Sequence, residues 1–362
     1  MPSVTTTPAR ALHLLPHQGV AGRTRAVIEF VRHERMDGAA DELVLTKRPL
    51  DVDRDFLAPA TPVHFLGLLD SSTAKRARRL ADLAVSREAR VLHAYTDADA
   101  RLAAQAARLE PGLAAVATPF ERPDAAGLFE RRRRARDLRS LRALHVPSPA
   151  LVADWTAAGR APDSVTVASV DTGRFHPQKQ ESSWRKARLP DPDTMLVGTL
   201  MRAEPGKRHD VLIEAVERRN AAGRATALMM VGEGPGYAAL KERARGSDHL
   251  FVRRRVLDAP GFFGKIDVFA LHAEDELVPI SLVEALSCGC ASVVADRGDV
   301  AQLVGADAAL FTEPGDVDAV VEALDRLGDP AERGVLETAA RQRALERHGL
   351  GRLRQETVAV YG

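Results

Sequence analysis

Short apolar runs that alternate with longer amphipathic stretches are the feature that most constrains the fold of this chain. The first run is ALHLL at 11–15, and an amphipathic stretch near 21–33 follows it. The next runs predicted as strands are 42–46, 63–67, 90–94 and 113–117, with helices predicted near 72–86 and 97–109. Strands separated by helix-length patterns are typical of parallel sheets covered by helices, so we expect an α/β protein.

The alternation is interrupted by a polar stretch at 171–193 that contains three prolines, a composition typical of a linker. Beyond it, strands are predicted at 194–200, 225–232, 250–254, 266–271 and 291–295, with helices near 207–222 and after Gly236. A chain of 362 residues exceeds one ordinary core. We therefore expect two doubly wound, Rossmann-like domains, 1–170 and 194–345, that face a ligand-binding cleft.

Composition excludes several classes of protein. The net charge of +1 and the aromatic content of 4% favour neither nucleic acid nor an acidic membrane as the partner of the whole chain. Cys288 and Cys290 form neither a disulfide framework nor a zinc pattern, so we expect two buried, reduced thiols. Neither a signal peptide nor a membrane-spanning run is visible, and we expect a cytoplasmic protein. The many Ala and Arg residues hint at a GC-rich bacterial genome.

The stretch EDELVPISLVEALSCGC (274–290) holds the first candidate site. Pro279 fits the first position of a helix and Gly289 fits its C-terminal cap. The residues between them are apolar in nearly every direction, which is typical of a buried helix. Glu284 is the exception, and a buried carboxylate needs a donor from the protein or from a ligand. In the alternative interpretation, Glu284 pairs with an arginine of its own domain and Glu276 is a solvated loop residue.

Three backbone amides at the start of this helix, those of Ile280, Ser281 and Leu282, form a candidate anion site. Glu276 lies before these amides and Glu284 lies after them. A ligand made of a sugar, a phosphate and a second sugar could therefore contact Glu276, the amides and Glu284 in turn, and a nucleotide-sugar has this form. Arg202 and Lys207 lie between a strand and a helix in VGTLMRAEPGKRHDVLIEA (197–215). They form a candidate diphosphate site, because Arg offers a planar fork and Lys a point charge. Alternatively, both are surface cations.

Four further segments have competing interpretations. The glycines of MMVGEGPGYAAL (229–240) form a tight turn or bind NADP. Asp97 and Asp99 start a helix or hold a divalent cation. The basic stretch 128–144 is a helix, expected to turn Leu128, Ala135, Leu138 and Leu141 inward, whose arginines are solvated or contact anionic lipid. Gly19 and Gly22 shape the turn after the first strand or approach a ligand across the cleft.

Together these segments resemble glycosyltransferase family 4, a group of retaining enzymes with the GT-B fold. EDELVPISLVEALSCGC resembles the family's E-x7-E signature, and 197–215 resembles its Arg and Lys segment. VTVASVDTGRFHP (165–177), VGEGP and FTEPGDVDAVVEAL (311–324) also match. The resemblance is strong over roughly residues 145–345. It implies transfer of a sugar from UDP-sugar or GDP-sugar to an acceptor hydroxyl, without a metal or other cofactor.

The resemblance also assigns roles to single residues. Arg202 and Lys207 would bind the donor diphosphate, Glu276 the hydroxyls of the donor sugar, and Glu284 the nucleotide ribose. The backbone of Val278, Pro279 and Ile280 would face sugar and phosphate. Together with Gly19 and Gly22, these residues would form the donor site, and Glu276, Arg202 and Lys207 would be the catalytic set.

The N-terminal domain would then be the acceptor side. Thr118 stands where many members of the family have a histidine, and His93 is the second candidate there. In such proteins the last helix, here within 346–362, tends to cross back to the first domain. The acceptor would be a small molecule, a glycan or a lipid-linked glycan, with peripheral membrane contact through 128–144. Three alternatives remain: an NADP-dependent oxidoreductase, a metal-dependent transferase that uses Asp97 and Asp99, and a sugar-nucleotide-binding protein without turnover.

Overall fold

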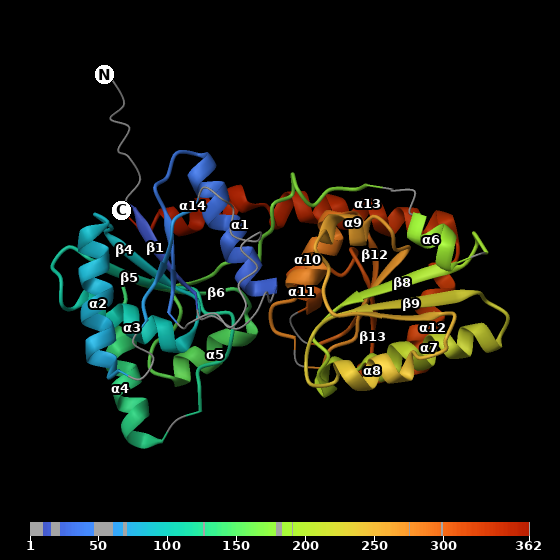
Figure 1. Ribbon diagram of the computed structural model, residues 1–362, viewed down its shortest axis with the longest axis horizontal. Helices are drawn as coiled ribbons and strands as arrows, with labels where there is room; N and C mark the ends of the chain where they lie inside the picture. The colour runs from blue at the N-terminus through green and yellow to red at the C-terminus, as the bar shows by residue number, and fades with distance from the viewer. Residues whose placement is uncertain are drawn as a thin grey trace. The chain divides into compact units, whose positions relative to one another are not determined.

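The structure is a computed structural model and consists of two compact units. It describes residues 10–15, 22–46, 61–67, 71–125, 127–178, 183–189, 191–274, 276–297 and 300–361. Unit 1 comprises Met1–Asp171 and Leu350–Gly362, and unit 2 comprises Thr172–Gly349. Each unit contains one parallel sheet with helices on its faces (Figure 1). The predicted class, two doubly wound parallel sheets, is confirmed.

Unit 1 has a seven-stranded sheet in the order β3-β2-β1-β4-β5-β6-β7. Its strands are β1 Ala11–Leu15, β2 Glu42–Leu45, β3 Val63–Phe65, β4 Val91–Ala94, β5 Ala114–Ala117, β6 Ala143–Val146 and β7 Ser164–Val165. All the strand pairs are parallel. Every residue of β1, β2, β4, β5 and β6 is buried, as expected for strands that are covered by helices on both faces.

The helices of unit 1 are α1 Gly22–Met36, α2 Thr73–Ser86, α3 Asp97–Ala107, α4 Leu128–Arg139, α5 Ala150–Ala157 and α14 Leu350–Val358. Helix α14 comes from the end of the chain and packs beside α1 (Figure 1). Arg354 of α14 binds the buried Glu34 of α1 at 3.3 Å and also Asp37 at 2.5 Å. Because a buried carboxylate requires a partner, these contacts attach the C-terminal helix to unit 1.

Unit 2 has a six-stranded parallel sheet in the order β10-β9-β8-β11-β12-β13. Its strands are β8 Met195–Leu200, β9 Thr226–Val231, β10 Leu250–Arg253, β11 Val268–Leu271, β12 Ala291–Ala295 and β13 Leu310–Thr312. Its helices are α6 Ser183–Arg188, α7 His209–Ala221, α8 Tyr237–Arg243, α9 Ala259–Phe263, α10 Ile280–Ser287, α11 Val300–Val304, α12 Val317–Arg326 and α13 Pro330–Arg347. A 3-10 turn, Pro205–Lys207, precedes α7.

The segment 171–193, expected to be a linker, belongs almost entirely to unit 2 and contains α6. Trp184 packs edge-to-face on Phe251, with the ring centroids 5.0 Å apart. Arg185 donates to Asp267 at 2.8 Å. Most of its described residues are at least partly exposed, which fits their polar composition, but Phe175 and Leu189 are buried and its contacts are those of a docked helix.

The basic stretch 128–144 is shorter as a helix than predicted. Helix α4 ends at Arg139, and Ala143–Val146 forms the buried strand β6. Leu138 and Leu141 are buried as expected, but Leu128 is 64% exposed and Phe129 is 80% exposed. The prediction failed because the apolar residues after 140 fit a buried strand as well as a helix face.

Candidate functional site

The order of strands in unit 2 creates a switch point between β8 and β11. From β8 the chain builds the sheet outward through β9 and β10, and it then returns to place β11 on the other side of β8. Val268 pairs with Val197 across this junction. The loops that follow β8 and β11 both lie at the carboxyl edge of the sheet. The carboxyl edge at such a switch point is the usual ligand site of an open α/β sheet.

The two loops at the switch point contact each other through backbone and side chains. The amide of Glu274 donates to the carbonyl of Gly206 at 2.8 Å. Lys207 Nζ lies 3.1 Å from Glu276 Oε2, and both side chains are largely buried. The structure therefore brings together the lysine of one predicted motif and the first glutamate of the other.

Arg202 is on the same loop as Lys207 but in a different environment. Its side chain is 55% exposed, and its Nε donates to Glu204 Oε1 at 2.5 Å. An exposed pair of this kind adds little stability and exchanges readily with solvent or ligand. Arg202 is thus a solvent-accessible cation of this loop, whereas Lys207 is fixed by its contact with Glu276.

Helix α10 is buried on all sides, as its sequence predicts. Its residues Ile280, Leu282–Leu286 and Ser287 are buried, and Glu284 is 1% exposed. Pro279 is the N-cap rather than the first helical residue, and Gly289 follows the C-cap with φ +68°. The expected C-terminal glycine is therefore in the left-handed conformation that favours it.

The turn before α10 corrects one expectation about the site. Val278, Pro279 and Ile280 are all buried. The amide of Ile280 donates to Val278 O at 2.9 Å, and that of Leu282 donates to Pro279 O at 3.0 Å. These two amides were predicted to be free for an anion, but the tight turn at Pro279 supplies their acceptors. The start of this helix is therefore a weaker anion site than the sequence suggested.

The glycines of VGEGPG are explained by close packing of two loops. A Cβ on Gly232 would lie 1.6 Å from Met201 O, and one on Gly234 would lie 2.6 Å from Ala203 O. The amide of Gly236 also donates to Ala203 O, at 2.8 Å. These glycines let the turn after β9 support the loop that carries Arg202 and Lys207. This packing accounts for them without a dinucleotide.

Sequence reasoning missed Arg208, His272 and Gly315, which lie around the same loops. Arg208 Nη1 donates to Glu274 Oε1 at 2.6 Å. The amide of Gly315 donates to His272 Nε2 at 2.7 Å, and burial lowers the pKa of this imidazole. Glu274 and Gly315 lie inside the segments 274–290 and 311–324 that resemble family motifs, but no pattern in the sequence marks their contacts.

The acceptor-side candidates of unit 1 lie inside its core. His93 is 1% exposed, with Nε2 at 2.8 Å from the Thr118 hydroxyl and Nδ1 at 2.7 Å from the Tyr361 hydroxyl. Burial lowers the pKa of His93 well below its ordinary value, so the ring is neutral. Both of its nitrogens are engaged, and this corrects the expectation that His93 and Thr118 present polar atoms to an acceptor.

Of the remaining candidates in unit 1, Gly22 is the first residue of α1, and Gly19 lies outside the described residues. Asp97 pairs with the buried Arg134 at 2.9 Å. Asp99 lies in the first turn of α3, where its amide donates to the Thr96 hydroxyl at 3.2 Å. Helix capping and an internal ion pair therefore explain these two aspartates.

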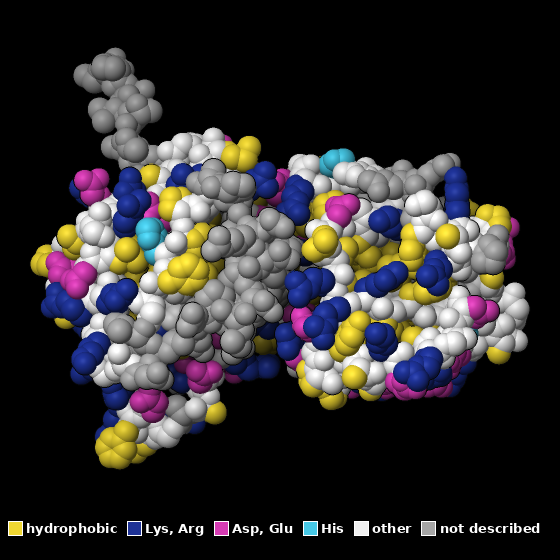
Figure 2. All heavy atoms as spheres, viewed as in Figure 1, with side chains coloured by type: hydrophobic (Ala, Val, Ile, Leu, Met, Phe, Trp, Pro, Cys, Tyr) yellow, Lys and Arg dark blue, Asp and Glu magenta, His cyan; other side chains and the backbone are white. Residues whose placement is uncertain are grey.

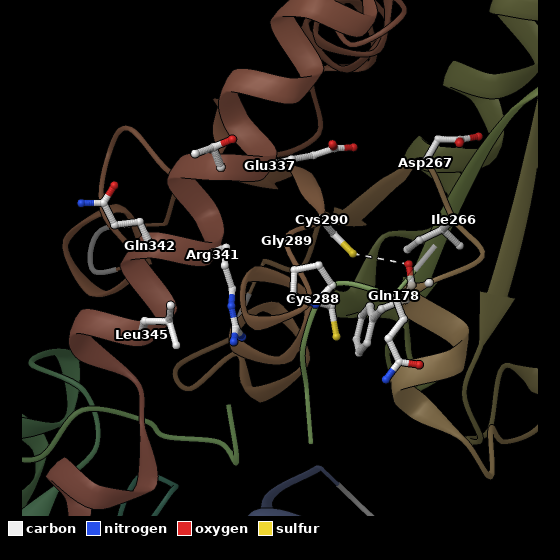
Figure 3. A pocket seen from close by; sticks show the side chains of 14 residues that line it. Gln178, Ile266, Asp267, Cys288, Gly289, Cys290, Glu337, Arg341, Gln342 and Leu345 are labelled. Carbon is white, nitrogen blue, oxygen red and sulfur yellow. Dashed lines mark hydrogen bonds between the residues drawn. The ribbon is translucent and has the colours of Figure 1, made fainter. Parts of the chain in front are cut away.

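A cavity of about 490 Å³ lies at the opposite edge of the unit 2 sheet (Figure 3). Arg341 reaches toward it from α13, and Cys288 and Cys290 line it. The Arg341 guanidinium is bound by backbone carbonyls, among them Ser287 O at 2.6 Å. Both cysteines are free and buried, and burial raises the pKa of Cys288 to about 12. This cavity is lined by the segment that follows α10 and by α13, and it is not part of the switch point.

Similarity to known proteins agrees with this arrangement. Residues 191–329 match the family described as "Glycosyl transferases group 1". The GDP-mannose-dependent alpha-(1-6)-phosphatidylinositol monomannoside mannosyltransferase of Mycolicibacterium smegmatis is 29% identical over 191 residues, which cover 49% of this chain and 50% of that protein. The match thus spans about half the length of that relative.

Solved structures share the fold of the whole chain. HepE of Anabaena, in complex with UDP and glucose, has a TM-score of 0.81 at 18% identity, covering 97% of this chain and 98% of that one. A glycosyltransferase of Rickettsia africae has a TM-score of 0.81 at 13% identity, covering 98% of each. Residues 191–329 are therefore similar to group 1 glycosyltransferases, and the chain as a whole has the GT-B fold.

Proposed function

We propose that this protein transfers a sugar from a nucleoside diphosphate sugar to a hydroxyl group of an acceptor. The observation that carries the proposal is the contact between Lys207 and Glu276 at the β8–β11 switch point, 3.1 Å apart. A fixed cation and a fixed carboxylate side by side suit a ligand that carries phosphate next to sugar hydroxyls. UDP and GDP are the candidate nucleotides, since the HepE structure contains UDP and the Mycolicibacterium relative is named as GDP-mannose-dependent.

Within this proposal, Lys207 and Arg202 bind the diphosphate. The held ammonium of Lys207 supplies fixed charge, and the exposed guanidinium of Arg202 exchanges Glu204 for phosphate oxygens. Glu276 accepts from hydroxyls of the donor sugar while it keeps Lys207 in place. Glu284, on the buried helix α10, accepts from the nucleotide ribose.

We also propose that transfer proceeds with retention and without a metal. Negative charge builds up on the departing diphosphate, and fixed cations can stabilise it where a divalent ion otherwise would. The departing phosphate oxygen takes the proton of the acceptor hydroxyl on the same face of the sugar, so the mechanism requires no side chain as nucleophile. The role of the chain is then positioning and charge stabilisation. Unit 1 would supply the acceptor side.

The α4 surface supports a further part of this proposal, peripheral contact with an anionic membrane on the cytoplasmic side. Leu128 and Phe129 are exposed at the start of α4, and exposed arginines follow at 131, 132, 133, 136 and 139. Figure 2 shows hydrophobic side chains at this end of unit 1. Apolar groups beside several cations fit a headgroup layer that carries phosphate. Among the described residues, no helix is both long and apolar enough to span a bilayer.

The test is a thermal-shift panel of UDP-sugars, GDP-sugars and NADP, followed by product detection with the donors that bind. A donor that binds only the folded state raises the melting temperature. We expect stabilisation by one nucleotide class and product that persists in excess chelator. Stabilisation without product for any acceptor would favour a sugar-nucleotide-binding protein. Stabilisation by NADP alone would favour an oxidoreductase, and loss of product with chelator would favour a metal-dependent transferase.

A further inference from the structure

Arg208 adopts a backbone conformation that arginine rarely takes. It lies between the turn Pro205–Lys207 and α7, with φ 45° and ψ 45°. Among the described non-glycine residues, only Glu88 shares a positive φ. The left-handed region is unfavourable for a residue with a Cβ, and such strain persists where the surrounding contacts enforce it. The contacts of Arg208 therefore need a physical account.

The guanidinium of Arg208 bridges two carboxylates on different elements. Its Nε donates to both oxygens of Asp210, at 3.1 and 3.2 Å, and its Nη1 donates to Glu274 Oε1 at 2.6 Å. Hydrogen bonds to Asp210 and then to Glu274 raise the pKa of this group. Asp210 lies in the first turn of α7, and Glu274 lies on the loop after β11. Arg208 thus connects the loop after β8 to the loop after β11.

A third loop, which follows β13, lies against the same guanidinium. Gly315 has φ +86°, and a Cβ there would lie 3.2 Å from Arg208 Nη1. The Gly315 amide donates to His272 Nε2, so this nitrogen carries no proton. Glycine at 315 therefore leaves room for Arg208, and the neutral His272 anchors the loop beside it.

We propose that Arg208 is a positioning residue, which fixes the loop that carries Glu276 relative to Lys207. It is next to Lys207 in sequence, and it holds Glu274, two residues before Glu276. A lysine ammonium is a point charge with little directionality, so its 3.1 Å contact with Glu276 depends on where the two loops are held. This inference rests on the proposed function, because the site that Arg208 shapes is the proposed donor site.

Replacing Arg208 by glycine separates the effect of its ion pairs from the effect of its backbone conformation. Arg208→Gly removes the guanidinium and suits the left-handed backbone, so the chain should fold without the strain. The lost ion pairs are only partly buried, and their contribution to stability is small. The melting temperature should therefore stay within about 2 °C of wild type.

The experiment is a double-mutant cycle with wild type, Arg208→Gly, Glu274→Gln and the double variant, titrated calorimetrically with UDP and GDP. If Arg208 acts through Glu274, each single change weakens binding about tenfold, and the double variant is also about tenfold weaker. Arg208→Lys, which keeps the charge, should recover part of the loss. Arg218→Ala removes an exposed arginine of α7 and should bind as wild type does.

The outcomes distinguish this inference from the proposed function. If wild type binds neither nucleotide, the proposed function fails first. If wild type binds and Arg208→Gly binds equally well, the positioning role is wrong. A double variant about a hundredfold weaker would mean that the two residues act independently, and would also overturn it. A melting temperature that falls in step with affinity would show a general loss of structure instead.

Discussion

Lys207 Nζ lies 3.1 Å from Glu276 Oε2, although the two residues are 69 positions apart in the sequence. The parallel pairing of β8 with β11 makes this contact, because it places the ends of both strands at one edge of the sheet. The pair is only partly accessible, so each member orients the other. The predictions below follow from this contact and from the surfaces around it.

Glu276→Gln should lower turnover more than donor affinity. The amide keeps the shape of the side chain, but it accepts more weakly from sugar hydroxyls and no longer pairs with Lys207. We expect kcat to fall about a hundredfold and the affinity for nucleoside diphosphate to fall about tenfold, because Lys207 loses the carboxylate that positions it. Steady-state kinetics and calorimetry measure the two quantities. Glu242→Gln, on the exposed face of α8, is the matched control. An unchanged kcat would contradict the role of Glu276.

Gly232→Ala should destabilise unit 2 and disturb the donor loop. The added Cβ would meet Met201 O at 1.6 Å, so the backbone of one loop must move. We expect a loss of about 1–3 kcal/mol in the free energy of unfolding, together with weaker nucleotide binding. Gly334→Ala is the control, since nothing lies within 4 Å of its Cβ position in α13. That change should stabilise the protein by about 1 kcal/mol. Denaturant unfolding of both variants decides, and equal effects would contradict the loop packing.

Much of the fold was predictable because its signals are local. Helix α10 is marked by Pro279 before it and Gly289 after it, and by apolar residues on every side. The buried strands are marked by apolar runs of the right length. The end of α4 was not predictable in this way, since the residues from 141 onward suit a helix or a strand. Tertiary burial chose the strand β6.

The candidate site was predictable only in part, because contacts between loops depend on tertiary structure. Lys207 and Glu276 were each marked by a motif, but their direct contact requires β8 to lie beside β11. Arg208 has no sequence signal at all, because glycine is the residue that marks a left-handed position. His93 was predicted only from the resemblance to the family. In the structure its ring nitrogens lie within hydrogen-bond distance of the Tyr361 and Thr118 hydroxyls in the core.

The free energy of unfolding should depend on pH through His209. Burial lowers the pKa of this imidazole from 6.5 to about 4. Between these values the unfolded chain binds the proton and the folded chain does not, so stability falls as pH drops from 6.5 toward 4. The difference between the two pKa values corresponds to roughly 3 kcal/mol in the free energy of unfolding. This stability is fully present above pH 6.5 and is lost as the pH falls to about 4.

His209→Gln removes this contribution while it keeps a polar side chain of similar length. Urea unfolding at neutral pH and near pH 4.5 gives the difference in stability between wild type and variant at each pH, in which other titrating groups cancel. We expect that difference to shrink by about 2–3 kcal/mol at the lower pH. A difference that stays constant would show that the buried imidazole does not control this pH range.

Replacing Leu128 and Phe129 with serine should weaken binding to anionic vesicles. Both side chains are exposed on α4, so the fold should not depend on them. We expect sedimentation with phosphatidylglycerol vesicles to fall at least about fivefold, and wild-type binding to decrease at high salt. Val335→Ser changes an exposed apolar residue of α13 and is the control. Wild type that ignores anionic vesicles, or a variant that binds them equally, would refute the membrane contact.

The most direct test of the donor site is calorimetric titration of UDP and GDP into wild type, Lys207→Ala, Glu284→Gln and Lys241→Ala. Lys241 is an exposed lysine of α8 in the same unit and serves as the control. We predict that wild type and Lys241→Ala bind one of the nucleotides equally well. Lys207→Ala and Glu284→Gln should each bind it at least about tenfold more weakly, a difference of about 1.4 kcal/mol. Equal affinity in all four proteins would contradict the account of the donor site.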